Sequence, residues 1–311
     1  MQEQNMAVVE DTGEFRCLRE QADVLGVPMS SVERLGLDLD DGRSLSALRF
    51  GADEPAVTLL HGAGLNAHTW DAVALLLGRS VLAVDLPGHG DSAWREDADY
   101  SPETLAVDVA SALETWTSQP QLLVGHSLGG LTAAIVAARH PHLVESLVLV
   151  DITPGVDPAA APAVLREFYA VTDFAARADA VERAVAFGLG GDRAATERGV
   201  FLNTRVRADG RVEWKHHLAH LLGHSFDAVR ARTEHGDEAG IAAWSALESL
   251  TVPVTLMRAA RGFLQDADVD EFTRRLPTAS VIAVDAGHNI QETAPAAIST
   301  LLTDALARPI R

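Results

Sequence analysis

The sequence GHSLGG at residues 125–130 decides the fold of this chain. It follows the apolar run 122–124 and precedes a stretch of small and apolar residues, 132–138. This order predicts a strand, a tight turn and a helix with a serine at the turn, and it matches the pattern G-x-S-x-G. Glycine allows the strand and the helix to pack closely around a strained turn. The Ser127 hydroxyl is therefore expected to stand clear of the backbone, where the free N–H groups of a helix start face developing negative charge.

A second glycine-rich turn, HGAG at 61–64, follows the apolar run 56–60. A turn of this kind can direct a main-chain N–H toward the reaction centre of a nucleophilic serine. We assign one such donor to Ala63 and the second to Leu128, directly after Ser127. Together the two amides would form an oxyanion hole, which stabilises the negative charge that develops during acyl transfer.

The chain has 12 histidines, and His288 differs from the others in its position. It follows the apolar strand predicted at 281–284 and precedes the last predicted helix. A serine followed late in the chain by a histidine is the order typical of serine hydrolases with a G-x-S-x-G turn. We expect the His288 imidazole to take the proton of Ser127 near neutral pH and to return it to the leaving group.

A fourth motif, DLPGHGDS at 85–92, follows an apolar strand and is interpreted as a rigid turn. We therefore expect Asp85 and His89 to be structural. With this motif the chain resembles the α/β-hydrolase superfamily, from about Ser31 to the C-terminus. The resemblance implies a Ser–His–acid triad, an oxyanion hole built by the two loops named above, and no metal or organic cofactor.

The acid of the triad is where the sequence departs from the commoner family pattern. In many relatives the acid lies a few residues past the strand that corresponds to 254–257. Here Gly262 occupies that place, and the first carboxylates are Asp266 and Asp268. The family's alternative position is the end of the preceding strand, where this chain has Asp151, at the edge of the sheet where catalytic groups gather. We assign the acid to Asp151; Asp266 or Asp268, or a site without a working acid, are the alternatives.

Composition and charge narrow the function further. The chain has 311 residues, 47% of them hydrophobic, and no apolar run long enough to cross a bilayer. Residues 1–15 lack the basic and apolar regions of a signal peptide, and the single Cys17 excludes an internal disulfide framework. A formal net charge of −19 disfavours nucleic acid and anionic membranes as partners. We expect a cytoplasmic protein that acts on a small molecule; a homo-oligomer is left open.

Strand and helix signals alternate through much of the chain, which predicts a mostly parallel, doubly wound sheet with helices on both faces. A hairpin of strands near 32–39 and 45–50 would be its antiparallel part. The alternation stops after residue 150 and resumes near residue 251. We therefore divide the chain into an N-terminal appendage (1–30), the first part of an α/β-hydrolase core (31–152), an inserted helical cap (153–247) and the second part of the core (248–311).

Four histidines of the predicted cap, His216, His217, His220 and His224, are spaced so that pairs of them share a helical face. A metal site requires more ligands in a defined geometry. We interpret the cluster as a solvated helix face.

These features predict a serine hydrolase that forms an acyl-enzyme on Ser127. Its substrate would be a small-to-medium, largely apolar ester, lactone or thioester that fits beneath the cap. One alternative uses the same pocket for carbon–carbon cleavage, cyclisation or elimination. Another is a ligand-binding receptor with a hydrolase fold. A serine at position 127 argues against the branches of the superfamily that form an ester intermediate on an aspartate.

Overall fold

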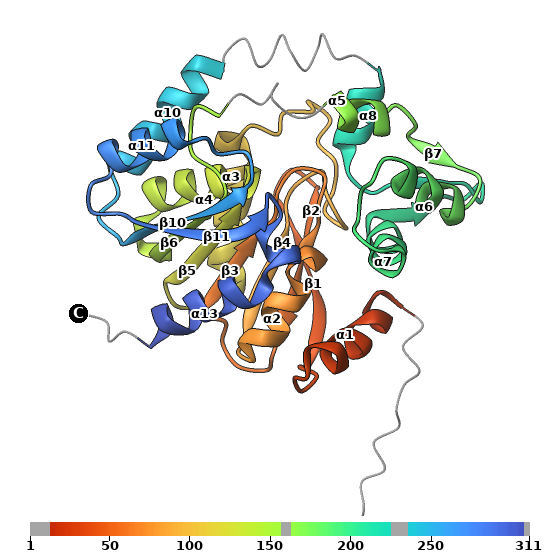
Figure 1. The fold of residues 1–311 in the computed structure, drawn as a ribbon, viewed down its shortest axis with the longest axis horizontal. Helices are drawn as coiled ribbons and strands as arrows, with labels where there is room; N and C mark the ends of the chain where they lie inside the picture. Colours follow the sequence, from red (N-terminus) through yellow and green to blue (C-terminus); the bar gives the residue numbers. More distant parts are fainter. Residues whose placement is uncertain (1–12, 157–162, 225–235, 308–311) are drawn as a thin grey trace, which may run out of the picture.

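The computed structural model describes residues 13–156, 163–224 and 236–307. Its centre is an eight-stranded sheet with the spatial order β1-β2-β4-β3-β5-β6-β10-β11 (Figure 1). Strands β1 and β2 pair antiparallel, as do β2 and β4, and all other neighbours are parallel. The strands are β1 (Val32–Asp38), β2 (Ser44–Phe50), β3 (Val57–Leu60), β4 (Val81–Asp85), β5 (Gln121–His126), β6 (Val144–Val150), β10 (Val254–Arg261) and β11 (Ser280–Gly287). The predicted fold class is confirmed.

Helices cover both faces of the sheet, and its mostly apolar central strands are buried along their whole length. One face packs against α3, α4, α10 and α11, and the other against α1, α2 and α13 (Figure 1). These helices are α1 (Leu18–Leu25), α2 (Asp71–Leu77), α3 (Pro102–Trp116), α4 (Leu128–Arg139), α10 (Gly236–Glu248), α11 (Asp266–Arg275) and α13 (Pro295–Leu306). A short helix, α12 (Ile290–Thr293), precedes α13.

Residues 163–224 form a separate lobe beside the core (Figure 1). Its elements are α5 (Ala163–Phe168), β7 (Asp173–Phe174), α6 (Arg177–Ala186), α7 (Arg193–Asn203), β8 (Thr204–Val206), β9 (Val212–Trp214) and α8 (His217–His224). The sequence predicted a helical cap, but the lobe also contains a three-stranded antiparallel sheet with the order β7-β9-β8. Strands of two or three residues are too short to show an alternating pattern in sequence.

The last helix of the range predicted as cap packs on the core. Trp244 and Leu247 of α10 are buried in the same apolar cluster as residues of α3 and α4. The lobe that can cover the sheet edge is therefore shorter than the range 153–247. Within the described residues, no helix has the length and apolar character required to cross a membrane.

The N-terminal segment is tied to the core by a charged network. Glu14 receives hydrogen bonds from the Arg34 guanidinium at 2.9 Å and lies 3.3 Å from His68 Nε2. His68 Nδ1 lies 3.0 Å from Asp71. Burial alone would lower the pKa of His68, but the carboxylates of Asp71 and Glu14 raise it to about 9. Burial would raise the pKa of Glu14, but its hydrogen bonds to His68 and Arg34 lower it to about 2.

This network predicts a pH-dependent stability. A histidine pKa raised from 6.5 to about 9 stabilises the fold fully below about pH 6.5, and this contribution is lost as the pH rises through 9. The stability difference between wild type and His68→Gln, measured by urea unfolding, should therefore shrink between pH 6 and pH 9.5. The exposed His142, replaced in the same way, serves as the control and should show no such trend. A difference that stays constant over this range would contradict the proposed charge on His68.

Candidate active site

Ser127 lies in a strained turn between β5 and α4. Its backbone angles are φ 50° and ψ −120°, a conformation that residues other than glycine adopt rarely. The Ser127 N–H donates to Val150 O at 3.2 Å, which ties the turn to the end of β6. The predicted order of strand, turn and helix is present, and the turn places the part-exposed serine at the carboxyl edge of the sheet.

Three glycines make this turn possible because any side chain on them would collide with backbone or core. A Cβ on Gly125 would overlap the carbonyl oxygen of Gly129. A Cβ on Gly129 would lie 2.5 Å from Leu60 O, and one on Gly130 would lie 2.5 Å from Ile152 Cγ2. The glycines therefore serve the close approach of α4 to the sheet.

Gly130→Ala is expected to destabilise the protein by about 1–3 kcal/mol, because the added methyl group overpacks this contact. Gly199→Ala is the matched control. Gly199 lies inside α7, and a Cβ there would meet nothing within 4 Å. This second change should stabilise the protein by about 0.5–1 kcal/mol through helix propensity. Urea unfolding measures both, and equal effects of the two substitutions would contradict the packing argument.

The two amides assigned to the oxyanion hole are available. Neither Ala63 N–H nor Leu128 N–H donates a hydrogen bond to any described residue. The loop that carries Ala63 is held by buried His61, whose Nδ1–H donates to Gly62 O at 2.8 Å and whose Nε2 accepts from Leu86 N–H at 3.0 Å. A Cβ on Gly62 would lie 3.1 Å from Ser127 Cβ, so this loop and the serine turn touch.

Asp151 contacts His288, as the sequence assignment requires. His288 Nδ1 lies 2.7 Å from Asp151 Oδ2, and the carboxylate is completely buried. Main-chain N–H groups hold its two oxygens, Ala259 donating at 2.9 Å to Oδ1 and Phe263 at 3.0 Å to Oδ2. A carboxylate that accepts the Nδ1 proton leaves Nε2 free to act as the base.

The carboxylate of Asp151 lies where a side chain at position 262 would stand. A Cβ on Gly262 would overlap Asp151 Oδ2, so no side chain fits at position 262 while Asp151 is present. Asp266, one of the alternative acids, forms an ion pair of 2.6 Å with Arg258 and is exposed. Asp268, the other, accepts from the Gln265 N–H at 2.7 Å at the start of α11. Neither forms a hydrogen bond or ion pair with His288 among the described residues.

Two further groups hold His288 and were not singled out from the sequence. The Phe263 ring stacks on the His288 imidazole, with centroids 3.7 Å apart and planes 17° apart. His126 Nε2 lies 3.2 Å from His288 O, and burial lowers the pKa of His126 well below its usual value. His126 therefore stays neutral and can donate its Nε2–H to the loop that carries the base. Its position inside the motif GHSLGG was the available signal.

The hydrogen bond between Ser127 and His288 is not formed in this conformation. The Ser127 hydroxyl has no hydrogen bond to any described residue. The two residues nevertheless lie on adjoining segments, because His126, next to Ser127, places its ring centroid 4.5 Å from that of His288. In free enzymes such catalytic hydrogen bonds are often long and tighten when substrate binds.

Asp85 and His89 take the structural roles expected of them. Asp85 is completely buried and accepts hydrogen bonds from Arg34 and from the N–H of Ala67, each at 2.7 Å. Burial would raise the pKa of Asp85, but the Arg34 guanidinium lowers it. His89 Nδ1–H donates to Pro87 O at 3.0 Å within the turn. Both side chains brace loops at the edge of the sheet.

The prediction of a solvated face is wrong for His216 and His217. His216 is 1% exposed. His217 stacks on Trp94 with centroids 4.5 Å apart, and its Nδ1 lies 2.7 Å from Tyr100 Oη. The side chain of His224 lies outside the described part of the chain. Helical spacing shows which residues share a face, but here the core loop 94–100 covers part of that face, which spacing does not show. The described residues hold no group of three or more potential ligands arranged for a metal.

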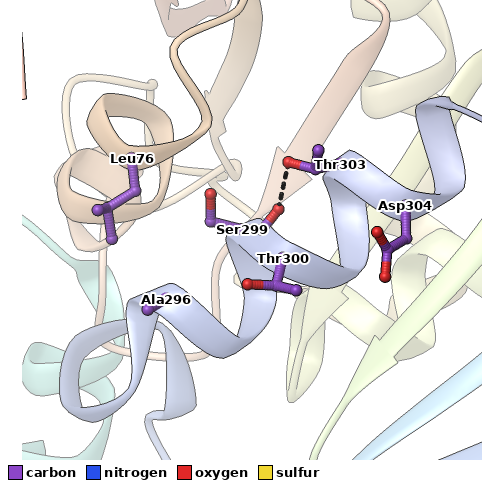
Figure 2. Close-up of a pocket in the computed structure, with 6 residues that line it drawn as sticks. All are labelled: Leu76, Ala296, Ser299, Thr300, Thr303 and Asp304. Atoms are coloured by element: carbon purple, nitrogen blue, oxygen red, sulfur yellow. Dashed lines mark hydrogen bonds between the residues drawn. The ribbon is translucent and has the colours of Figure 1, made fainter.

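A surface groove between α2 and α13 is unrelated to this site (Figure 2). Leu76, Ser299 and Thr303 are among the residues that line it, and none of the residues described above does.

The sheet, the strained serine and the acid–histidine pair define an α/β hydrolase. The family model described as "alpha/beta hydrolase fold" matches residues 55–295, and the chain belongs to this family. It is 36% identical over 304 residues to "Esterase Rv0045c" of Mycobacterium tuberculosis, a match that covers 94% of this chain and 95% of that protein. The predicted superfamily and the prediction of a hydrolase enzyme are confirmed.

Solved structures agree with this assignment. A structure of the Mycobacterium tuberculosis esterase Rv0045c matches with a TM-score of 0.81 and 35% identity, covering 96% of this chain and 100% of that chain. An E-2-(acetamidomethylene)succinate hydrolase matches with a TM-score of 0.75 and 22% identity, covering 89% of this chain and 100% of that chain. At that identity the second likeness concerns the fold alone.

Proposed function

We propose that this protein is a serine esterase that hydrolyses small-to-medium, largely apolar esters through an acyl-enzyme on Ser127. The observation that carries the proposal is the buried Asp151 carboxylate, 2.7 Å from His288 Nδ1. Such a pair leaves Nε2 as a base beside the serine turn. The similarity to an esterase over nearly the whole chain supports the same reaction class.

In this mechanism His288 Nε2 removes the Ser127 proton as the hydroxyl oxygen attacks the acyl carbon. The oxyanion that forms is stabilised by the N–H groups of Ala63 and Leu128, which donate to no described residue. The imidazolium, held by Asp151, then protonates the leaving alkoxide, and the acyl-enzyme forms. Water, deprotonated by the same imidazole, releases the acid and restores the serine.

The cap supports the preference for apolar substrates. Its interior is apolar, and the aromatic side chains of Phe168, Phe174 and Trp214 are buried there together. Tyr169 of this cluster reaches the loop next to Ala63, with its hydroxyl oxygen 3.2 Å from the position of a Cβ on Gly64. Largely apolar walls with a few polar groups are typical of small-molecule sites.

A fluorophosphonate probe tests the proposal directly, because it phosphonylates serines that a base has activated. Peptide mass spectrometry should find one adduct, on the peptide that contains Ser127. One probe molecule bound per protein chain should also be enough to stop ester hydrolysis. Product analysis should find an acid and an alcohol. If the protein neither reacts with the probe nor hydrolyses any ester, the result would favour the alternative of a ligand-binding receptor with a hydrolase fold. Products of carbon–carbon cleavage, cyclisation or elimination would favour the other alternative.

A further inference from the structure

Tyr169 presents an unused hydroxyl group to the oxyanion loop. The residue follows α5, and its ring packs edge-on against His216, with centroids 4.8 Å apart. Its hydroxyl oxygen lies 3.2 Å from the position of a Cβ on Gly64 and makes no hydrogen bond to any described residue. Burial raises the pKa of Tyr169, so the phenol stays neutral and keeps its proton to donate.

His216 presents a second unused donor beside it. Its Nδ1 accepts from Ala219 N–H at 3.2 Å, so the ring proton of the neutral imidazole is on Nε2. Nε2 is buried and has no hydrogen-bond partner among the described residues. Burial lowers the pKa of His216 well below its usual value, so the ring does not gain a second proton. A buried donor left unpaired is unfavourable, which calls for a partner beyond the described residues.

His89, whose ring also lies near that of His216, presents an unused acceptor. Its Nδ1–H donates to Pro87 O at 3.0 Å, so Nε2 carries the lone pair. This Nε2 is also buried without a partner among the described residues. The rings of His89 and His216 are nearly parallel, 16° apart, with centroids separated by 6.1 Å. Two donors and one acceptor are therefore carried by neighbouring rings, and His89 and Tyr169 both lie beside the loop that carries Ala63.

We propose that Tyr169, His216 and His89 form a polar subsite that binds a neutral oxygen, a hydroxyl or a ketone, carried by the acyl chain of the substrate. A ketone oxygen accepts from the two donors, and a hydroxyl in addition donates to His89. None of the three groups is charged, so the subsite suits a neutral oxygen better than a carboxylate. The inference rests on the proposed esterase function and narrows its substrates to hydroxy- or oxo-acyl esters. The three residues determine specificity and take no part in bond cleavage.

The test compares p-nitrophenyl esters of acyl chains that carry a hydroxyl at C3 to C6 with unsubstituted esters of equal length. At least one hydroxy ester should be preferred by wild type in kcat/KM, and Tyr169→Phe should lower this preference about tenfold or more. Tyr100→Phe is the matched control. It removes the other tyrosine hydroxyl of the chain, which is bonded to Arg95 N–H at 2.9 Å, and should leave the preference unchanged.

Three results would overturn the subsite: no preference for any hydroxy ester, an unchanged preference in Tyr169→Phe, or an equal loss for both ester series. An equal loss of kcat/KM for the hydroxy esters and the unsubstituted esters would mean that Tyr169 acts at the reaction centre, which both series share. Calorimetry with Ser127→Ala separates this inference from the esterase proposal, because binding needs no turnover. In this variant, the methyl ester of the preferred hydroxy acid should bind more tightly than the unsubstituted methyl ester of the same chain length. If all esters resist hydrolysis yet this difference persists, the esterase proposal fails and the subsite stands.

Discussion

Replacing Ser127 with alanine is expected to lower kcat for ester hydrolysis by about six orders of magnitude. The substitution removes the only atom that can form the acyl-enzyme, and the Ala63 and Leu128 amides alone retain a small residual activity. Ser127 is part-exposed in a turn already determined by the backbone, so the fold should be preserved. Steady-state and single-turnover kinetics with a p-nitrophenyl ester measure the effect.

Ser299→Ala provides the control for this experiment. Ser299 is buried in the groove between α2 and α13 that Figure 2 shows, and no catalytic group lines that groove. This variant should keep wild-type kcat and its reaction with the fluorophosphonate probe. If Ser127→Ala retained more than about one per cent of wild-type kcat, an acyl-enzyme on this serine could not be the route.

The second large effect is expected at the acid. Asp151→Asn should lower kcat by about four orders of magnitude, because an amide nitrogen facing His288 Nδ1 favours the wrong tautomer of the imidazole. The buried carboxylate oxygens accept from Ala259 and Phe263 N–H groups, and the asparagine can satisfy only one of them. Steady-state kinetics with a p-nitrophenyl ester measure the loss.

Asp266→Asn and Asp268→Asn are the matched controls, since the same chemical change falls on the two other candidate acids. Both side chains lie at the start of α11, and neither contacts His288 among the described residues. Each should keep kcat within about twofold of wild type, as surface changes usually do. A ranking in which one of these variants loses more activity than Asp151→Asn would overturn the assignment.

A relocated acid gives a sharper version of the same test. Gly262→Asp alone should be disruptive, because a Cβ there overlaps Asp151 Oδ2. Asp151→Gly removes that obstacle together with the acid. The double variant Asp151→Gly/Gly262→Asp should therefore be more active than Asp151→Gly alone. An equally inactive double variant would show that the β10 loop of this chain cannot present a carboxylate to His288.

Most of the strand positions could be predicted because burial on both sides of a sheet leaves continuous apolar runs. The apolar runs 56–60 and 122–124 correspond to β3 and β5 within a residue or two. The three short strands of the cap were missed, since elements of two or three residues carry no periodic signal. Helix α10 has the composition of the cap, but its packing against α4 depends on contacts that its own sequence does not encode.

For the active site, local sequence was sufficient wherever a turn demands particular residues. Gly125 and Gly129 of GHSLGG lie so close to backbone atoms that a Cβ would overlap them, and a Cβ on Gly62 of HGAG would overlap the His126 ring. Such glycine-rich turns reveal Ser127 and the oxyanion loop from sequence. The identity of the acid depended on long-range packing. Asp151 and His288 are 137 positions apart, and their contact exists because β6, β10 and β11 lie side by side.

The cap histidines show the same difference between what the local sequence predicts and what long-range packing decides. Helical spacing predicts that His216 and His220 share a face, but His216 lies just before α8, and spacing is silent on what covers either residue. His216 is buried and lies near both Tyr169 of the cap and His89 of the core, three segments that meet only when the lobe packs on the core. Turn geometry is a local property of the chain, whereas desolvation and hydrogen-bond partners depend on which distant surfaces come together.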